Sequence, residues 1–327
     1  YLNLTTAGNG ATLVGNSNTG IGAYFGNVTV SGTSLNISGT SNTGSGARIG
    51  GLSPTLAMPK LLNTSTSTVS GTVTTNSVNN TVLAADTTGN LTQTGGTFNI
   101  TGVSNNSGMG VNLVGNLTQN NGALNINGTN SNGSGTGVNI VGNLTQNNGT
   151  LNITGTNLNS TGNAVNYVSG QLAQNNGTLN ITGTNTATGV AAGKGVNLGN
   201  NFTLTNGSLN IIGTTNSGQN SVASGIYNQA GVSLSGSSFV QSSGSANIIG
   251  SADVGNGVGW YFGNATQSGG RIDINATTNR GGGALNFGGN FTQSSGILNI
   301  TGTSLASDVA IQFAPTNFTQ NNGTINR

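Results

Sequence analysis

Short runs in which apolar and polar residues alternate recur along the whole chain, separated by small groups of Asn, Ser and Gly. In Leu151, Asn152 and Ile153, every second residue is aliphatic, which is the pattern of a strand with one buried face. The phrase VGNLTQNNGTLNITGT, residues 141–156, returns with small changes through most of the sequence. No segment has apolar residues at helical spacing, so we predict an all-β protein.

The copies of this phrase follow one another at a period near 27 residues. Aligned on the first apolar residue of each copy, the equivalent positions are Val28, Leu91, Leu117, Leu144, Leu172, Phe202, Phe239, Ala265, Phe291 and Phe318. Most gaps are 26 to 30 residues, one is 37, and one is 63 residues with a degenerate copy around residues 67–76. Each copy reads as three short strands, like GNLTQ, TLNITGT and GVNIVG, with Gly and Asn at the turns. The pattern predicts a parallel β-solenoid (β-helix) with about 27 residues per coil, three short strands per coil and roughly eleven coils.

Stacked coils place equivalent residues against each other, with parallel strands about 4.8 Å apart. We therefore expect Leu117 against Leu144 and Ile126 against Ile153. One coil cannot bury its apolar face alone, which makes residues 1–327 a single elongated solenoid domain. Two stretches interrupt the pattern: residues 51–68, which contain two prolines and are expected to form a lateral loop, and residues 216–238, expected to be a looped-out coil.

The recurring amides suggest ladders between coils. In-register Asn or Gln side chains can donate to one neighbouring copy and accept from the other. We expect such ladders in the second strand and beside the first turn, at Asn125, Asn152, Asn180, Asn210, Asn247 and Asn299, and at Gln119, Gln146, Gln174, Gln267, Gln293 and Gln320. Stacked like charges would repel, which agrees with a charged content of only 3%.

Composition excludes several kinds of chemistry. The net charge is +2 and the six basic residues are scattered, so no nucleic-acid partner is expected. The chain has no His and no Cys, which excludes a Ser-His-Asp triad and imidazole or thiolate metal ligands. Asp253, Asp273 and Asp308 fall at different places around the coil, so we predict no enzyme, no cofactor and no metal. Arg271, Asp273 and Arg280 form one local charge group, interpreted as a cross-strand ion pair.

Disorder and membrane insertion are also disfavoured. Gly occupies 58 positions, but the low net charge and the regularly placed aliphatic residues are not typical of a disordered chain. No run of 18 apolar residues occurs, so no transmembrane segment is expected.

The phrase at residues 141–156 and its copies resemble the repeats of large secreted β-helical surface proteins, the filamentous-haemagglutinin-type adhesins and autotransporter passenger domains. The resemblance covers most of the chain outside about residues 51–86. It implies an exported, right-handed parallel β-helix with a structural or adhesive role, outside the cell or at its surface.

The leading functional prediction is a structural filament subunit that assembles with itself, head to tail. The chain opens with a run like the second strand TLNIT, and its last copy stops where its own second strand begins. Such ends could pair their open strand edges with the next copy. The candidate assembly edges are Tyr1, Leu2, Asn3 and Leu4 at one end, and Phe318, Gln320 and Ile325 at the other.

Three further surfaces give alternatives. The loop at 51–68 either folds over its own coil or docks a neighbouring subunit through Leu52, Leu56, Met58 and Leu61. Strand alternation predicts that Tyr24 and Tyr261 point inward and Trp260 outward, which makes Trp260, with Tyr261, the candidate glycan contact of an adhesin. Ice binding by a hydroxyl ladder is a third reading, at Thr118, Thr145, Thr292 and Thr319.

Overall fold

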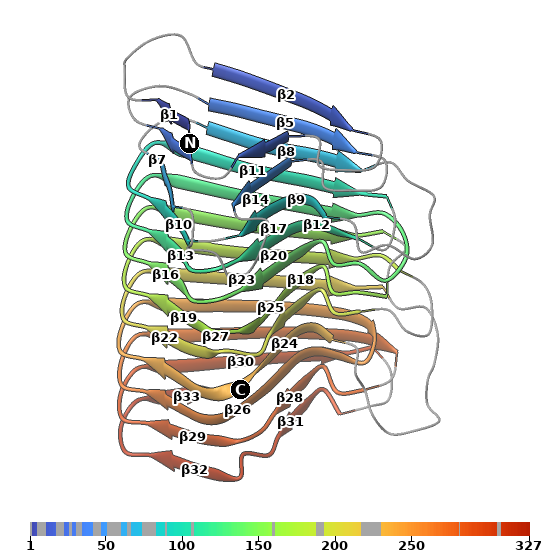
Figure 1. The fold of residues 1–327 in the computed structure, drawn as a ribbon. Helices are drawn as coiled ribbons and strands as arrows, with labels where there is room; N and C mark the ends of the chain where they lie inside the picture. The colour runs from blue at the N-terminus through green and yellow to red at the C-terminus, as the bar shows by residue number, and fades with distance from the viewer. Residues whose placement is uncertain are drawn as a thin grey trace.

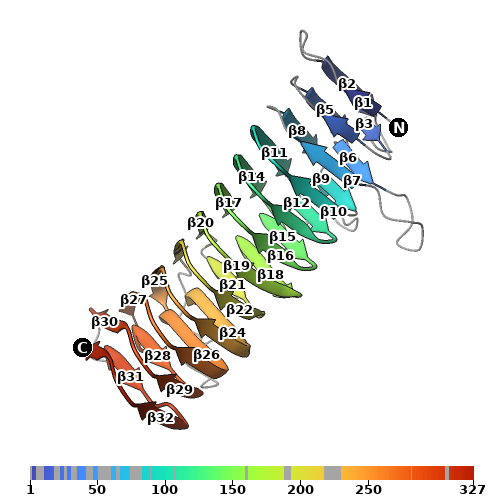
Figure 2. The same ribbon diagram turned by 90° about the vertical axis from the view of Figure 1, so that its left-hand side faces the viewer.

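The computed structural model describes residues 2–4, 11–17, 23–25, 28–30, 35–41, 47–50, 60–63, 67–73, 83–88, 90–105, 108–158, 161–187, 193–216, 230–280, 282–305 and 309–327. These residues form strands β1 to β33 and no helix (Figure 1). The strands run parallel and stack into a solenoid with ~27-residue spacing. The stack is elongated, and its first and last strands lie at opposite ends (Figure 2).

The strands form three ladders, in which each strand pairs with its equivalents one copy before and after. The first ladder comprises β1 (Leu2–Leu4), β4 (Val28–Val30), β7 (Lys60–Asn63), β10 (Asn90–Gln93), β13 (Leu117–Gln119), β16 (Leu144–Gln146), β19 (Gln171–Gln174), β22 (Asn201–Leu204), β24 (Ala230–Gln241), β26 (Asn256–Gln267), β29 (Asn290–Gln293) and β32 (Asn317–Gln320).

The second ladder is a separate 12-stranded sheet. It comprises β2 (Ala11–Ser17), β5 (Leu35–Ser41), β8 (Ser67–Val73), β11 (Thr97–Ser104), β14 (Ala123–Asn130), β17 (Thr150–Asn157), β20 (Thr178–Asn185), β23 (Ser208–Thr215), β25 (Ser245–Val254), β27 (Arg271–Arg280), β30 (Ile297–Ser304) and β33 (Thr324–Asn326).

The third ladder joins the first through the long strands β24 and β26, which take part in both. Its other members are β3 (Ala23–Phe25), β6 (Ala47–Gly50), β9 (Leu83–Thr88), β12 (Met109–Val114), β15 (Val138–Val141), β18 (Val165–Ser169), β21 (Val196–Leu198), β28 (Leu285–Phe287) and β31 (Ile311–Phe313).

Alternation along many of the described strands, above all those of the second ladder, separates the core from the surface. Leu117 pairs with Leu144, and Ile126 with Ile153, as predicted. Strand β17 alternates half-buried and buried residues along its whole length, so Leu151 and Ile153 lie in the core while Asn152 faces outward. From Leu91 onward the coils contribute the same kind of inward residue, so the core of this part of the chain is one continuous apolar column inside the three ladders.

Glycine forms the corner between the first and second strands. Gly149 has φ +80°, a region that residues with a Cβ rarely adopt. A Cβ at this position would lie 2.3 Å from the carbonyl oxygen of Gly122, its equivalent one coil earlier. The same corner is stacked in successive coils, which explains why the Asn-Asn-Gly turn is repeated in the sequence.

The predicted lateral loop at residues 51–68 is wrong for residues 60–63 and 67–68, which lie in strands. Leu61 lies in β7 and pairs with both Val28 and Leu91, so it supplies the anchor missing from the 63-residue gap. Ser67 and Thr68 begin β8, in the degenerate copy that the sequence indicated. Leu52, Leu56 and Met58 lie outside the described residues. The prolines interrupt the strand pattern in the sequence, but the pairing of Leu61 with Val28 and Leu91 shows that the first ladder continues through this coil.

Two other predicted boundaries change. Ala230 begins β24, whose Val232 and Leu234 are buried, so the looped-out coil predicted at 216–238 is wrong from residue 230 onward. Leu2 pairs with Val28, which places β1 in the first ladder and not, as predicted, in the position of the second strand. Both types of strand alternate Leu, polar and aliphatic residues, so the pattern of β1 alone does not distinguish them.

Candidate functional site

An asparagine ladder runs along the outer face of the second ladder. Each side-chain amide donates from Nδ2 to Oδ1 of the equivalent residue one coil earlier, and the distance is 2.7 or 2.8 Å from Asn125 to Asn99, Asn152 to Asn125, Asn180 to Asn152 and Asn210 to Asn180. The predicted Asn ladder is therefore present from Asn99 to Asn210. It has a direction, because donors point toward the N-terminal end and acceptors toward the C-terminal end.

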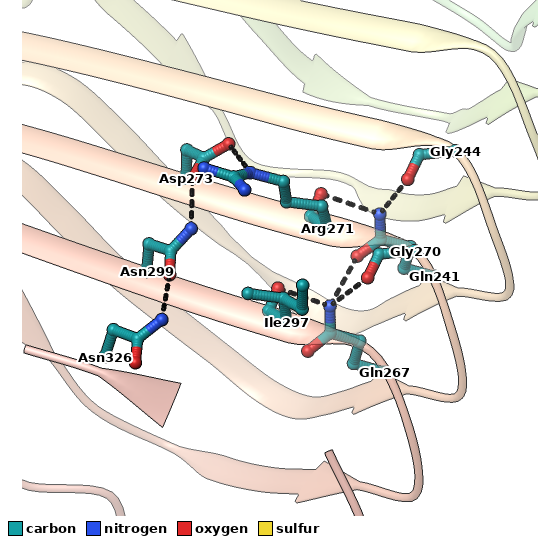
Figure 3. Close-up of polar contacts among 9 residues, drawn as sticks. All are labelled: Gln241, Gly244, Gln267, Gly270, Arg271, Asp273, Ile297, Asn299 and Asn326. Atoms are coloured by element: carbon teal, nitrogen blue, oxygen red, sulfur yellow. Dashed lines mark hydrogen bonds and ion pairs between the residues drawn. The ribbon is translucent and has the colours of Figure 1, made fainter. Parts of the chain in front are cut away.

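Asp273 replaces an asparagine in this ladder (Figure 3). Its Oδ1 accepts a 2.6 Å hydrogen bond from Asn299 Nδ2, and Asn326 in turn donates to Asn299 Oδ1 over 2.7 Å. Its Oδ2 accepts from Arg271 Nε at 2.6 Å, two residues away on the same strand. Burial raises the pKa of Asp273, but the hydrogen bonds from Arg271 and Asn299 outweigh burial and leave the pKa below its usual value.

The other ion pair joins neighbouring coils. Arg280 Nη2 contacts Asp253 Oδ2 on the preceding strand of the second ladder, and the hydrogen bond from Arg280 lowers the pKa of Asp253. The predicted group of Arg271, Asp273 and Arg280 is therefore divided. Arg271 pairs along its own strand, and the cross-strand partner of Arg280 is Asp253, which the sequence interpretation left out.

The glutamines beside the first turn do not form the simple ladder that was predicted. Gln146 is fully buried, and its Nε2 donates to the carbonyl oxygens of Gly149 at 3.1 Å and Thr178 at 2.7 Å. Gln119 binds its own turn and the next coil in the same way. Direct bonds between glutamines occur from Gln267 to Gln241 and from Gln293 to Gln267 (the Gln241 and Gln267 turns are drawn in Figure 3). The inward amide thus gives the turn carbonyl a second donor, in addition to a backbone N–H of the next coil.

A second asparagine ladder lies on the third ladder and ends at a lysine. Asn139 donates to Asn112, Asn166 to Asn139 and Asn197 to Asn166. Lys194 Nζ donates to Asn197 Oδ1 at 2.9 Å and to Ser233 Oγ at 3.0 Å, and burial lowers the pKa of this lysine. Lys194 therefore links Asn197 to Ser233, the equivalent residue of the next coil.

The structure reverses the predicted orientations of Trp260 and Tyr261. Trp260 pairs with Leu234 and Phe287, is fully buried, and its ring stacks on Phe287 with centroids 5.2 Å apart. Tyr261 is instead 42% exposed. The prediction aligned both residues on the following Gly-Asn pair, but Trp260 is four residues before Asn264, whereas its partner Phe287 is three residues before Asn290. A one-residue shift exchanges the inward and outward faces of a strand.

The aligned Tyr24 shows a related shift. In the backbone register Tyr24 pairs with Arg48, and this column continues through Asp86 to Asn112. The prediction had assigned Tyr24 to the column of Leu113. The Gly-Asn pair that follows each aromatic run therefore gives the wrong column for both Tyr24 and Tyr261.

The threonine column of the first ladder is interrupted. Thr118 pairs with Thr145, and Thr292 with Thr319. Between these pairs the column passes through Ala173 and Val240, which have no hydroxyl group. The hydroxyl array considered for ice binding is therefore not continuous.

The C-terminal end of the stack presents strand edges and part of the apolar core. Strands β31, β32 and β33 pair with β28, β29 and β30 on one side and have no described strand on the other. Phe318 is 37% exposed, while Phe313 and Ile325 are partly buried against the core. The guanidinium carbon of Arg327 lies 4.1 Å from the centroid of the Phe313 ring. Of the residues predicted at the other edge, Leu2, Asn3 and Leu4 lie in β1, and Tyr1 is outside the described residues.

The described part of the chain contains no group of three or more His, Cys, Asp or Glu residues that could hold a metal ion. A search of the same residues for a helix able to span a membrane found none. Comparisons with protein-family models, with curated proteins and with solved structures found no match to this chain.

Proposed function

We propose that this protein is a structural subunit of an extracellular or cell-surface filament and that copies associate head to tail by strand addition. The observation that carries the proposal is the in-register stacking of equivalent parallel strands from coil to coil, which continues up to β31, β32 and β33. Unpaired parallel strand edges are templates for another chain. In this proposal each coil has three short strands, and roughly eleven coils form one subunit.

The ladders define which strands would meet. Strands β1, β2 and β3 are the first described members of the three ladders, and β32, β33 and β31 are the corresponding last members. A second copy would therefore place β1 on β32 and β2 on β33, and the third ladder would lack one strand between β31 and β3. The exposed Phe318 ring would be covered in this contact, which adds apolar burial to the backbone hydrogen bonds.

The amide ladders support growth in one direction. Asn326 donates to Asn299, so its own Oδ1 faces the next coil as an acceptor. An incoming coil needs only a donor at this position. The low charge of the chain is consistent with a long stack, since charges repeated at each coil would repel.

The proposal is tested by comparing the chain with two lysine variants of β32. Phe318 lies in the inward column, below the buried Phe291, whereas Thr319 lies in the outward column below Thr292. We expect the wild-type protein to form fibres with a ~4.8 Å layer line by cryo-electron microscopy. Phe318→Lys should abolish assembly, because a charge would enter the apolar contact, and Thr319→Lys should assemble.

Two results would contradict the proposal. The first is a wild-type protein that remains monomeric in sedimentation velocity at high concentration. The second is Phe318→Lys assembling as well as Thr319→Lys. Circular dichroism of both variants would show whether the solenoid itself is intact.

A second candidate function is a segment of a long β-helical adhesin that binds glycans. The observation that favours it is the exposed ring of Tyr261, since aromatic faces stack on sugars. On a glycan array, Tyr261→Ala should lose binding that the wild-type chain shows. Equal binding by the two proteins would remove Tyr261 as the contact.

A further inference from the structure

A groove of about 580 Å³ lies on the outer face of the second ladder, toward its C-terminal end. It follows the column of stacked asparagines. Arg271 lies in the neighbouring outward column on one side, and Asn275 and Thr301 lie in the neighbouring outward column on the other side. The column within the groove consists of Asn247, Asp273, Asn299 and Asn326. The groove is therefore parallel to the axis of the solenoid.

Two neighbouring outward positions change together at this groove. In β17 and β20 these positions are Thr150 with Asn152 and Thr178 with Asn180, whereas β27 has Arg271 with Asp273. A carboxylate accepts hydrogen bonds but does not donate, so Asp273 removes the donor that an Asn would offer to the preceding coil. The solenoid forms this strand with Thr and Asn elsewhere, so the Arg-Asp pair is not needed to build a coil.

The groups exposed in the groove select a class of ligand. The guanidinium and the carboxylate cancel in charge, and the remaining lining residues are asparagines, Thr301 and Ile274, whose side chain is buried. Asp273 already accepts from Arg271 and Asn299, but each of its oxygens can accept a further hydrogen bond. The other guanidinium N–H groups of Arg271 are donors on a side chain that is 55% exposed. The groove thus offers both donors and acceptors of hydrogen bonds.

Other polymers fit this chemistry less well. Nucleic acid requires a net positive surface for its phosphates, and the groove has no net charge. Peptide recognition uses an open strand edge, an apolar groove or a charged motif, and this groove lies on a paired sheet face lined mainly by polar side chains. A neutral polyhydroxylated chain needs many donors and acceptors and no net charge.

We propose that this groove binds a neutral saccharide chain, which lies along the asparagine column and makes hydrogen bonds to Arg271 and Asp273. This site is distinct from Tyr261, which belongs to β26, and it does not depend on filament assembly. The proposal concerns recognition only, with no reaction at the site.

The test uses a variant that restores the common residues of the repeat. In Arg271→Thr/Asp273→Asn, the strand has the same two residues as β17 and β20, so we expect the variant to fold. Asn180→Ala is the matched control, because it changes the same column outside the groove. Cellohexaose, maltohexaose and mannohexaose are the probes, measured by saturation-transfer difference NMR.

We expect at least one hexasaccharide to bind the wild-type protein. The double variant should raise its Kd about tenfold or more, since hydrogen bonds to two charged groups are lost. Asn180→Ala should stay within about twofold of wild type. The proposal is overturned if none of the three probes binds, or if the double variant and the wild-type protein have the same Kd.

Discussion

Replacing Gly149 by alanine should strongly destabilise the coil that contains β16 and β17. The residue has φ +80° and forms the corner between these strands. A new Cβ would lie 2.3 Å from the Gly122 carbonyl oxygen, whereas ordinary contacts begin near 3.4 Å. The two stacked corners would have to separate by about 1 Å.

The magnitude follows from what that oxygen does. Gly122 O accepts hydrogen bonds from Thr150 N at 2.8 Å and from Gln119 Nε2 at 3.1 Å. A non-glycine residue in the left-handed region costs about 1–2 kcal/mol. Weakening two hydrogen bonds adds about 0.5–1.5 kcal/mol each. We therefore expect Gly149→Ala to lower the free energy of unfolding by about 2–5 kcal/mol.

The assay is urea unfolding followed by circular dichroism, with hydrogen exchange to localise the effect. Gly288→Ala is the matched control, because its nearest atom would be 3.7 Å away and its φ is not in the left-handed region. Faster exchange in Gly149→Ala should be concentrated in β14, β17 and their shared turn. If the two alanine variants unfold within about 0.5 kcal/mol of each other, the stacked-corner reasoning is wrong.

Three further predictions concern the core, a turn and acid stability. Trp260 is the single tryptophan and is fully buried, so its fluorescence should resist iodide quenching, and strong quenching in the folded protein would refute the burial. Trp260→Ala should lower the free energy of unfolding in urea by about 3–5 kcal/mol. Tyr167 Oη accepts from Leu144 N at 3.0 Å, so Tyr167→Phe should cost about 1–3 kcal/mol by leaving that buried N–H unpaired, and no loss of thermal stability would contradict this role. The pKa values of Asp253 and Asp273 are lowered in the folded state, so their contribution is present above the ordinary Asp pKa of about 4 and is lost as pH falls through the folded pKa. Both are partly solvent-exposed, so the effect should stay below about 1 kcal/mol in thermal melts from pH 5 to pH 2, and it should disappear in Asp253→Asn/Asp273→Asn.

Much of the fold could be predicted because each coil of a solenoid repeats the same short strands and turns. The spacing of Leu117, Leu144 and Leu172 gave the period, and these residues pair in the structure. Alternation in β17 gave the buried and exposed faces correctly. The Asn column could be predicted because identical amides, placed in register, have few other partners.

Other features could not be read from the repeat. Inward glutamines share the same spacing as the asparagines, but Gln146 lies inside a corner, where turn carbonyls are nearer than another glutamine. The groove at Arg271 and Asp273 also depends on residues from several coils, of which the sequence interpretation identified only the two charged ones.

The sequence by itself determined the all-β character, the period and the residues that stack between coils, because these depend on alternation and repetition along the chain. Only the tertiary structure decided that β1 and Leu61 belong to the first ladder, that Trp260 is buried and that Arg280 pairs with Asp253. Each of these depends on register between strands far apart in sequence. A shift of one residue leaves the local pattern almost unchanged and exchanges core for surface.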